Sequence, residues 1–88
     1  MAEELHYLEI ELAQELSLHE LEGILTAIRG YFDNSFKNYR LEHNLLIIIV
    51  DTDAENILAD LDQIKLDLED LRIDYHDVVE VTAKGEIL

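Results

Sequence analysis

The segment Leu45–Val50, which reads LLIIIV, is apolar at every position and rich in β-branched residues. A run of this kind is typical of a central strand, because both faces of such a strand are covered. A strand-like stretch at 36–42 precedes it. A tight hairpin around His43-Asn44 is the predicted connection, because Asn tolerates a positive φ angle. One long, bent strand over 36–50 is the alternative.

Upstream of this hairpin, the chain predicts a strand followed by a helix. Leucine and isoleucine alternate with tyrosine and glutamate over 7–12, which is the period of a strand with one wet face. Ser17 and Glu20 have the spacing of a capping box, and apolar residues then recur at helical spacing as far as Phe32. We therefore expect a helix at about 18–33.

The same order recurs downstream. Thr52 and Glu55 repeat the capping-box spacing and predict a second helix at about 53–72. Side chains alternate over 78–83, with Val79, Val81 and Ala83 on one face of the predicted strand. This pattern predicts a last strand, which Gly85 ends. The apolar stripe of the second helix consists of Ile57, Leu61, Ile64, Leu68 and Leu71.

The predicted order is β-α-β-β-α-β. Two βαβ units with right-handed crossovers place both helices on one face of a four-stranded antiparallel sheet. This two-layer α+β sandwich resembles the ferredoxin-like arrangement in topology. We expect a single domain over 1–88, since 88 residues leave no room for a second one. The fold carries many unrelated activities, so function has to be argued from sites.

The charge of the chain excludes several classes of function. There are 21 Asp and Glu residues against 6 Lys and Arg, for a formal net charge of −15. Direct binding to nucleic acid or to an anionic membrane needs clustered cations. The lack of cysteine excludes thiol catalysis, disulfides and thiolate zinc sites. An acidic start, and no apolar run near the ~20 residues that span a bilayer, predict a cytoplasmic protein.

The residue patterns also predict no metal, no cofactor and no enzymatic activity. The four histidines are isolated, with none three to five residues from the next, as zinc ligands commonly are. Asp51, Asp53 and Glu55 are spaced as in a calcium loop, but the glycine that such a loop requires is missing. No carboxylate lies beside a Gly-rich loop or a Ser/His partner.

The carboxylates of the predicted second helix form two rows. The row opposite the apolar stripe consists of Glu55, Asp62 and Glu69. The row at the shoulder of the stripe consists of Asp53, Asp60, Asp67 and Asp74. Charges in a row are about 10.5 Å apart, close to the about 10.2 Å that three nucleotides span. Phosphate mimicry is therefore geometrically admissible, and a solvated acidic face is the alternative.

The face of the sheet that the helices leave uncovered is the second candidate surface. We assign to it Leu46, Ile48 and Val50 of the central strand; in the alternate register Leu45, Ile47 and Ile49 lie there instead. Tyr7, Glu9 and Glu11 of the first strand should flank this strip. An apolar strip with a polar rim is a usual interaction surface. The strip is either shaded surface, a homodimer contact or the site of another partner.

These features predict a small, non-enzymatic protein that binds and blocks a basic partner, one that normally holds nucleic acid. In size and charge the chain is similar to the acidic inhibitors that phages and mobile elements use against restriction or CRISPR effectors, and to immunity proteins of nuclease toxins. One alternative is a structural or regulatory subunit that dimerises through the open sheet face. Another is a ferredoxin-like sensor of a small ligand.

Overall fold

The computed structural model describes residues 4–84, which form a four-stranded antiparallel sheet and two helices. The elements in chain order are β1 (Glu4–Leu12), α1 (Leu18–Phe32), a short 3₁₀ turn η1 (Asp33–Ser35), β2 (Phe36–Glu42), β3 (Leu45–Val50), α2 (Ala54–Asp70) and β4 (Tyr75–Lys84). The α+β class and the hairpin are confirmed. The single long strand over 36–50 is wrong, because β2 turns back and pairs with β3.

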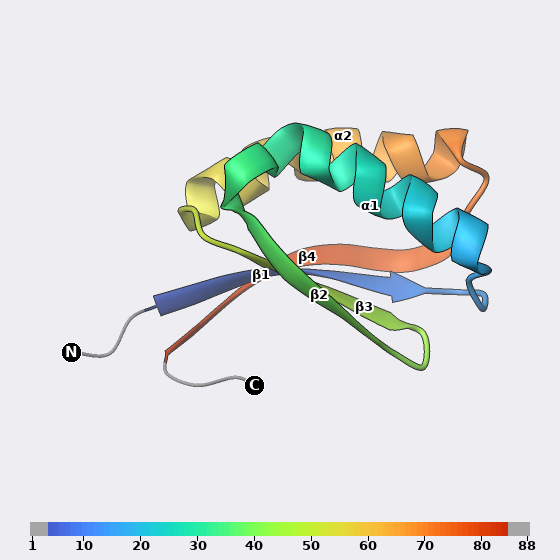
Figure 1. The fold of residues 1–88 in the computed structure, drawn as a ribbon, viewed down its shortest axis with the longest axis horizontal. Helices are drawn as coiled ribbons and strands as arrows, with labels where there is room; N and C mark the ends of the chain where they lie inside the picture. Colours follow the sequence, from blue (N-terminus) through green and yellow to red (C-terminus); the bar gives the residue numbers. More distant parts are fainter. Residues whose placement is uncertain (1–3, 85–88) are drawn as a thin grey trace.

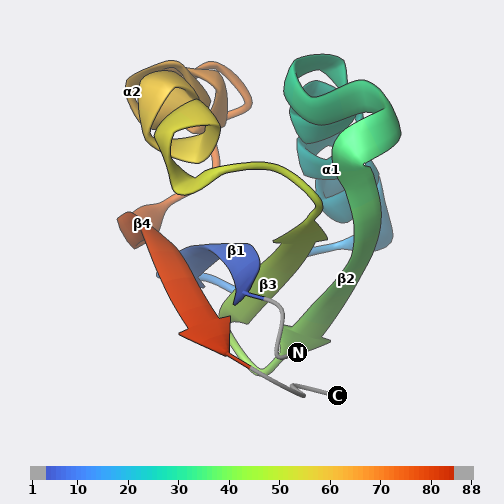
Figure 2. The ribbon, with the colours of Figure 1, turned by 90° about the vertical axis from the view of Figure 1, so that its left-hand side faces the viewer.

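The sheet has the strand order β2-β3-β1-β4, with every neighbouring pair antiparallel. Because β3 and β1 are the inner strands, their residues are bordered on both sides. Both helices lie on the same side of the sheet, and within residues 4–84 no helix or strand covers the other side (Figures 1 and 2). We call this uncovered side the open face.

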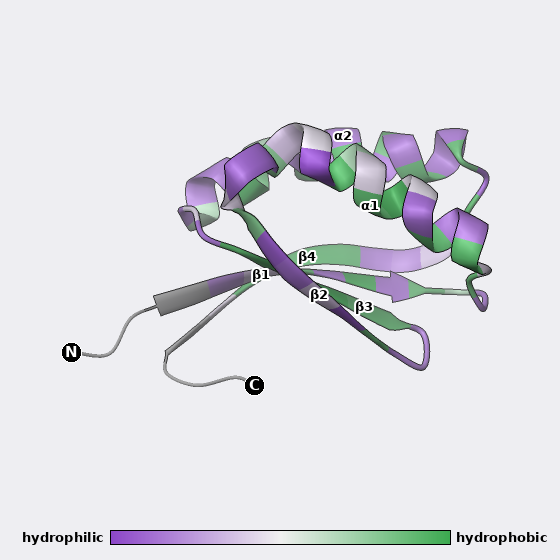
Figure 3. Cartoon of the chain, viewed as in Figure 1, coloured by the Kyte–Doolittle hydropathy of each residue, from purple (hydrophilic) through white to green (hydrophobic). Residues whose placement is uncertain are grey.

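The core lies between the helices and the sheet. Leu8 and Ile10 of β1 stand opposite Ile48 and Leu46 of β3, and all four are fully buried. The helices add a complementary apolar layer, and hydrophobic residues alternate with hydrophilic ones along both of them (Figure 3). The helical members of the core are Ile24, Leu25, Ile28, Phe32, Ile57, Ile64 and Leu68.

The assigned register of β3 is wrong. Leu46, Ile48 and Val50, which we assigned to the open face, are at most 2% exposed and belong to the core. The alternate register is the observed one, since successive side chains of a strand point to opposite faces. The residues of β3 on the open face are Leu45, Ile47 and Ile49, opposite Glu11, Glu9 and Tyr7 of β1.

The capping box of α1 is confirmed. The Ser17 hydroxyl accepts a hydrogen bond from the Glu20 backbone N–H at 3.1 Å, and the Ser17 N–H donates to Glu20 Oε1 at 2.9 Å. The hydrogen bond from the Ser17 N–H, followed by the Ser17 side chain, lowers the pKa of the Glu20 carboxyl. Leu18, the first residue of α1, is exposed although it is apolar.

The second capping box is wrong. Asp53 is the N-cap of α2 and makes no capping bond with its side chain. The Thr52 hydroxyl instead accepts a hydrogen bond from Asn56 Nδ2 at 2.7 Å. Once Asp53 is the N-cap, the third helical position is Asn56, so Glu55 is not placed to make the reciprocal bond.

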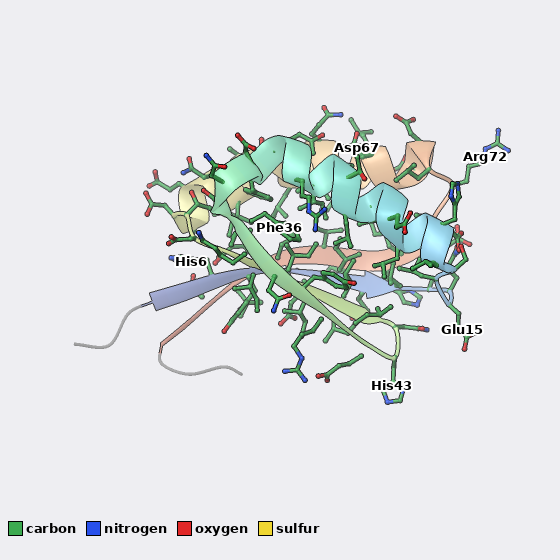
Figure 4. The ribbon with its side chains drawn as sticks, in the orientation of Figure 1. His6, Glu15, Phe36, His43, Asp67 and Arg72 are labelled. Atoms are coloured by element: carbon green, nitrogen blue, oxygen red, sulfur yellow. The ribbon has the colours of Figure 1, made fainter. Side chains whose placement is uncertain are left out.

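Three connections carry a backbone conformation that side chains rarely adopt, and one of them is Arg72 between α2 and β4, with φ 61°. The turn between β2 and β3 has its positive φ, 54°, at His43 rather than at the expected Asn44 (Figure 4). Asp33, which ends α1, has φ 48° and ψ −116°. Its N–H nevertheless donates to the Arg29 carbonyl, so the strained residue also closes the helix.

Loss of the Ser17 cap should destabilise the protein more than loss of the Thr52 hydroxyl. We expect Ser17→Ala to lower the free energy of unfolding by about 1 kcal/mol. Thr52→Ala should have a clearly smaller effect, because Thr52 bonds only to an exposed side chain. Urea unfolding followed by circular dichroism measures both. Equal losses would contradict the different caps of α1 and α2.

Glycine should relieve the strain at Asp33. We expect Asp33→Gly to raise the free energy of unfolding by about 1 kcal/mol, since glycine reaches a positive φ without a steric penalty. Asn34→Gly is the matched control. Asn34 has no positive φ, so the greater freedom of glycine should lower the free energy of unfolding there. A loss of stability in Asp33→Gly would show that the aspartate side chain outweighs the strain.

Candidate functional site

The charge of α2 is not neutralised within the described part of the chain. This helix carries six carboxylates and one cation, Lys65. Residues 4–84 contain one ion pair, Arg40–Glu42, and one contact between a histidine ring and a carboxylate, His6–Glu80 at 3.4 Å. Neither pair involves α2, so its negative charge is available to act on surrounding molecules.

The row opposite the buried stripe lies where the sequence placed it. Glu55, Asp62 and Glu69 are all exposed. The buried residues of α2 point to the sheet instead. Glu69 also accepts a hydrogen bond from the hydroxyl of Tyr75 at 3.3 Å. This row therefore presents three carboxylates to solvent along the full length of the helix.

The shoulder row is not a continuous face. Asp67 accepts a hydrogen bond from the Tyr31 hydroxyl of α1 (Figure 4), so α1 covers this side of α2. Asp53 is the N-cap, and Asp74 lies beyond the end of the helix, where its N–H donates to Gln14 Oε1 at 2.9 Å. Asp60 is half-buried. The predicted row is thus divided among a cap, an interhelical contact and a turn.

The Tyr31–Asp67 contact changes the acidity of the tyrosine. Burial of the Tyr31 hydroxyl, followed by its hydrogen bond to Asp67 and the charges of Asp67 and Asp60, raises its pKa to about 12. The folded protein therefore holds this proton more tightly than the unfolded chain does. Tyr31 and Asp67 thus join α1 to α2 through a polar contact beside the apolar core.

Two exposed leucines on α2 were missed by the sequence interpretation. Leu58 is 55% exposed and Leu66 is 51% exposed. With Asp62 between them at a spacing of four residues, they lie along one line of the helix. We call the surface formed by Glu55, Leu58, Asp62, Leu66 and Glu69 the outer face of α2. In the sequence, Leu58 and Leu66 stand outside the apolar stripe of the helix, and this position is the signal that predicts their exposure.

The open face has a buried tyrosine at its centre. Tyr7 lies between Ile49 of β3 and Val81 of β4 and is only 4% exposed, although it is absent from the core cluster. Its hydroxyl has no hydrogen-bond partner among the described residues. Burial, and then the charge of Glu9, raises the pKa of this hydroxyl.

Apolar and acidic residues share the rest of the open face. Ile47 is half-buried and Val79 is 37% exposed, and the two stand on either side of Glu9. The strand pairing places three more carboxylates on this face, around Leu45 near the turn between β2 and β3. They are Glu11, Glu42 and Asp77.

The other kinds of site are metal-ligand clusters and cavities. In residues 4–84, no group of three or more histidine or carboxylate side chains could hold a metal ion. The apolar cavity between α1 and α2 measures about 10 Å³, room for no more than one water molecule. Larger, open hollows of about 580 Å³ and 490 Å³ lie at the turn between β2 and β3 and beside the start of α1. No helix in the described range is long and apolar enough to cross a membrane.

Comparison of the chain with protein-family models, with curated proteins and with solved structures gives no match. The outer face of α2 and the open face of the sheet are therefore judged on their own geometry.

The Tyr31–Asp67 contact should be visible in the alkaline pH dependence of stability. The stabilisation by the Tyr31 proton is complete below pH 10.0, the usual pKa, and is lost as the pH rises toward about 12. Tyr31→Phe should therefore flatten the fall of the urea midpoint in this range. An unchanged slope would show that Tyr31 does not keep its proton through Asp67 and burial.

Proposed function

We propose that this protein is a non-enzymatic inhibitor that binds a basic protein through the outer face of α2. The partner is a protein that normally holds nucleic acid, and occupation of its basic groove would exclude the nucleic acid. We place this action in the cytoplasm.

The observation that carries the proposal is the mixture of exposed leucines and unneutralised carboxylates on one helix face. Leu58 and Leu66 are each more than half exposed, among Glu55, Asp62 and Glu69. A helix face that only contacts solvent needs charged residues and has no need of exposed leucines. Leucines among them supply the short-range apolar contact that holds a complex together, while the charges steer its formation.

The spacing of the carboxylates supports competition with nucleic acid. Residues seven apart on a helix are separated by about 10.5 Å, and three nucleotides on one strand span about 10.2 Å. A groove that binds consecutive phosphates can therefore meet Glu55, Asp62 and Glu69 at similar intervals. The net charge of −15 directs the protein to the basic protein rather than to the nucleic acid.

We propose further that the architecture is ferredoxin-like. Read from the β4 edge, the strand order is β4-β1-β3-β2, and each helix connects two strands that have one other strand between them in the sheet. This order is expected when two βαβ units interleave with crossovers on one side. The fold would present α2 as a rigid rod at the surface.

Reversal of the outer charges should slow partner binding without loss of the fold. We expect the triple variant Glu55→Lys, Asp62→Lys and Glu69→Lys to lower the association rate by about tenfold or more at low salt. Added salt should slow the wild type in the same direction. Surface-based kinetics on a partner recovered by low-salt pull-down gives the rates, and nucleic acid should compete for that partner.

The matched control reverses three exposed carboxylates away from the outer face, namely Glu15, Glu22 and Asp51. It has the same net charge as the triple variant and should bind faster than it does. A second variant, Leu58→Ser with Leu66→Ser, should raise the dissociation rate at every salt concentration. Unchanged, salt-independent binding by the triple variant would make the outer face of α2 a solvated surface only.

A further inference from the structure

We infer that the open face of the sheet docks a basic amphipathic helix of a partner protein, whose cationic side chains pair with the carboxylates of this face and hydrogen-bond the Tyr7 hydroxyl. This surface lies on the side of the sheet away from both helices (Figures 1 and 2). It is therefore separate from the outer face of α2, and the inference stands whether or not α2 binds a partner.

The Tyr7 hydroxyl is the first observation. It has less than 1 Å² of accessible surface and no partner among residues 4–84. An unpaired buried hydroxyl destabilises the free protein, so its presence calls for a reason other than stability. Phenylalanine would fill the same space without this penalty. A tyrosine at the centre of this sheet face is explained if the side chains that cover its hydroxyl in the free protein move aside on binding and the hydroxyl gains a partner.

The shape of the face indicates a helix as the occupant. The open face has an apolar row across β3, β1 and β4, formed by Ile49, Tyr7 and Val81. Ile47 and Val79 extend it two residues along β3 and β4, on either side of Glu9. A sheet with one covered face buries its second face by adding another layer, and helices already form the layer on the opposite side. The apolar stripe of one amphipathic helix matches such a band.

The charge of the face indicates a basic occupant. Glu9, Glu11 and Asp77 lie on this face, where the one cation that the pairing places there, Arg40, is already paired with Glu42. A second copy of the chain would bring the same carboxylates together, with −15 on each chain. Like charges at an interface oppose association, whereas lysine or arginine on a partner helix complements them.

A designed peptide tests the inference directly. The probe is a fluorescein-labelled peptide of about four helical turns, with leucine on one face and lysine on the other. A peptide of the same composition in shuffled order, without an amphipathic face, is its control. Fluorescence anisotropy should show that the protein binds the amphipathic peptide and that the shuffled peptide binds at least tenfold more weakly. Equal binding of the two peptides would overturn the inference, because charge alone would then account for it.

Variants of the two surfaces locate the contact. Ile47→Ser with Val79→Ser, both on the open face, should weaken peptide binding at least tenfold while circular dichroism shows an intact fold. Leu58→Ser with Leu66→Ser, on the outer face of α2, should leave it unchanged. The opposite pattern would place the helix on α2 and overturn the inference. A variant that has lost its fold is replaced by Val79→Thr, a milder change that should weaken binding in the same direction.

The hydroxyl of Tyr7 has its own test. Tyr7→Phe should raise the thermal midpoint of the free protein, since an unpaired hydroxyl is removed, and should weaken peptide binding several-fold. A purely structural tyrosine would change the midpoint and leave the affinity as it is, which would overturn the role given to the hydroxyl. Sedimentation of the wild type tests whether a second copy of the chain occupies the open face instead. A dimer that Ile47→Ser converts to a monomer would show that a second copy covers the face.

Discussion

The pairing of β1 with β3 is the contact on which the rest of the structure depends. Leu8 stands opposite Ile48 and Ile10 opposite Leu46, and these four buried side chains form the floor on which both helices pack. The alternate positions of β1 carry Glu9 and Glu11, which cannot be buried without a large electrostatic penalty. β1 therefore determines which side of the sheet the helices cover, and β3 must follow it. A slip of one residue would exchange the core and the open face.

This dependence explains why the elements could be predicted from the sequence while one register could not. The alternation in β1 shows its inner face directly. In β3 both faces are apolar, so the segment LLIIIV contains no residue that must lie outside. Its register follows from the β1 pairing, which depends on the geometry of the turns and not on the strand itself. The assignment of Leu46, Ile48 and Val50 to the open face failed for this reason.

The two helix caps show the same limit on a smaller scale. Ser17-x-x-Glu20 and Thr52-x-x-Glu55 have identical spacing, yet only the first forms a capping box. The N-cap of α2 is Asp53, whose side chain makes no capping bond, so α2 begins one position later than the Thr52 spacing predicts. The shoulder row of carboxylates shows the same limit of sequence spacing. Periodicity groups Asp60 with Asp67, but it does not reveal that Tyr31 of α1 lies against Asp67.

The outer face of α2 and the open face of the sheet are both negatively charged, but they would bind a partner through different interactions. On α2 the carboxylates surround isolated leucines on a narrow helix, which favours a groove in the partner and rapid, salt-sensitive association. On the sheet an apolar band with a buried hydroxyl dominates, which favours a close-fitting layer and slow dissociation. The salt dependence of binding does not by itself distinguish the two surfaces, because the excess of negative charge acts on any cationic partner at both of them. Substitution of apolar residues does distinguish the two surfaces, since Leu58 and Leu66 are on one side of the molecule and Ile47 and Val79 are on the other.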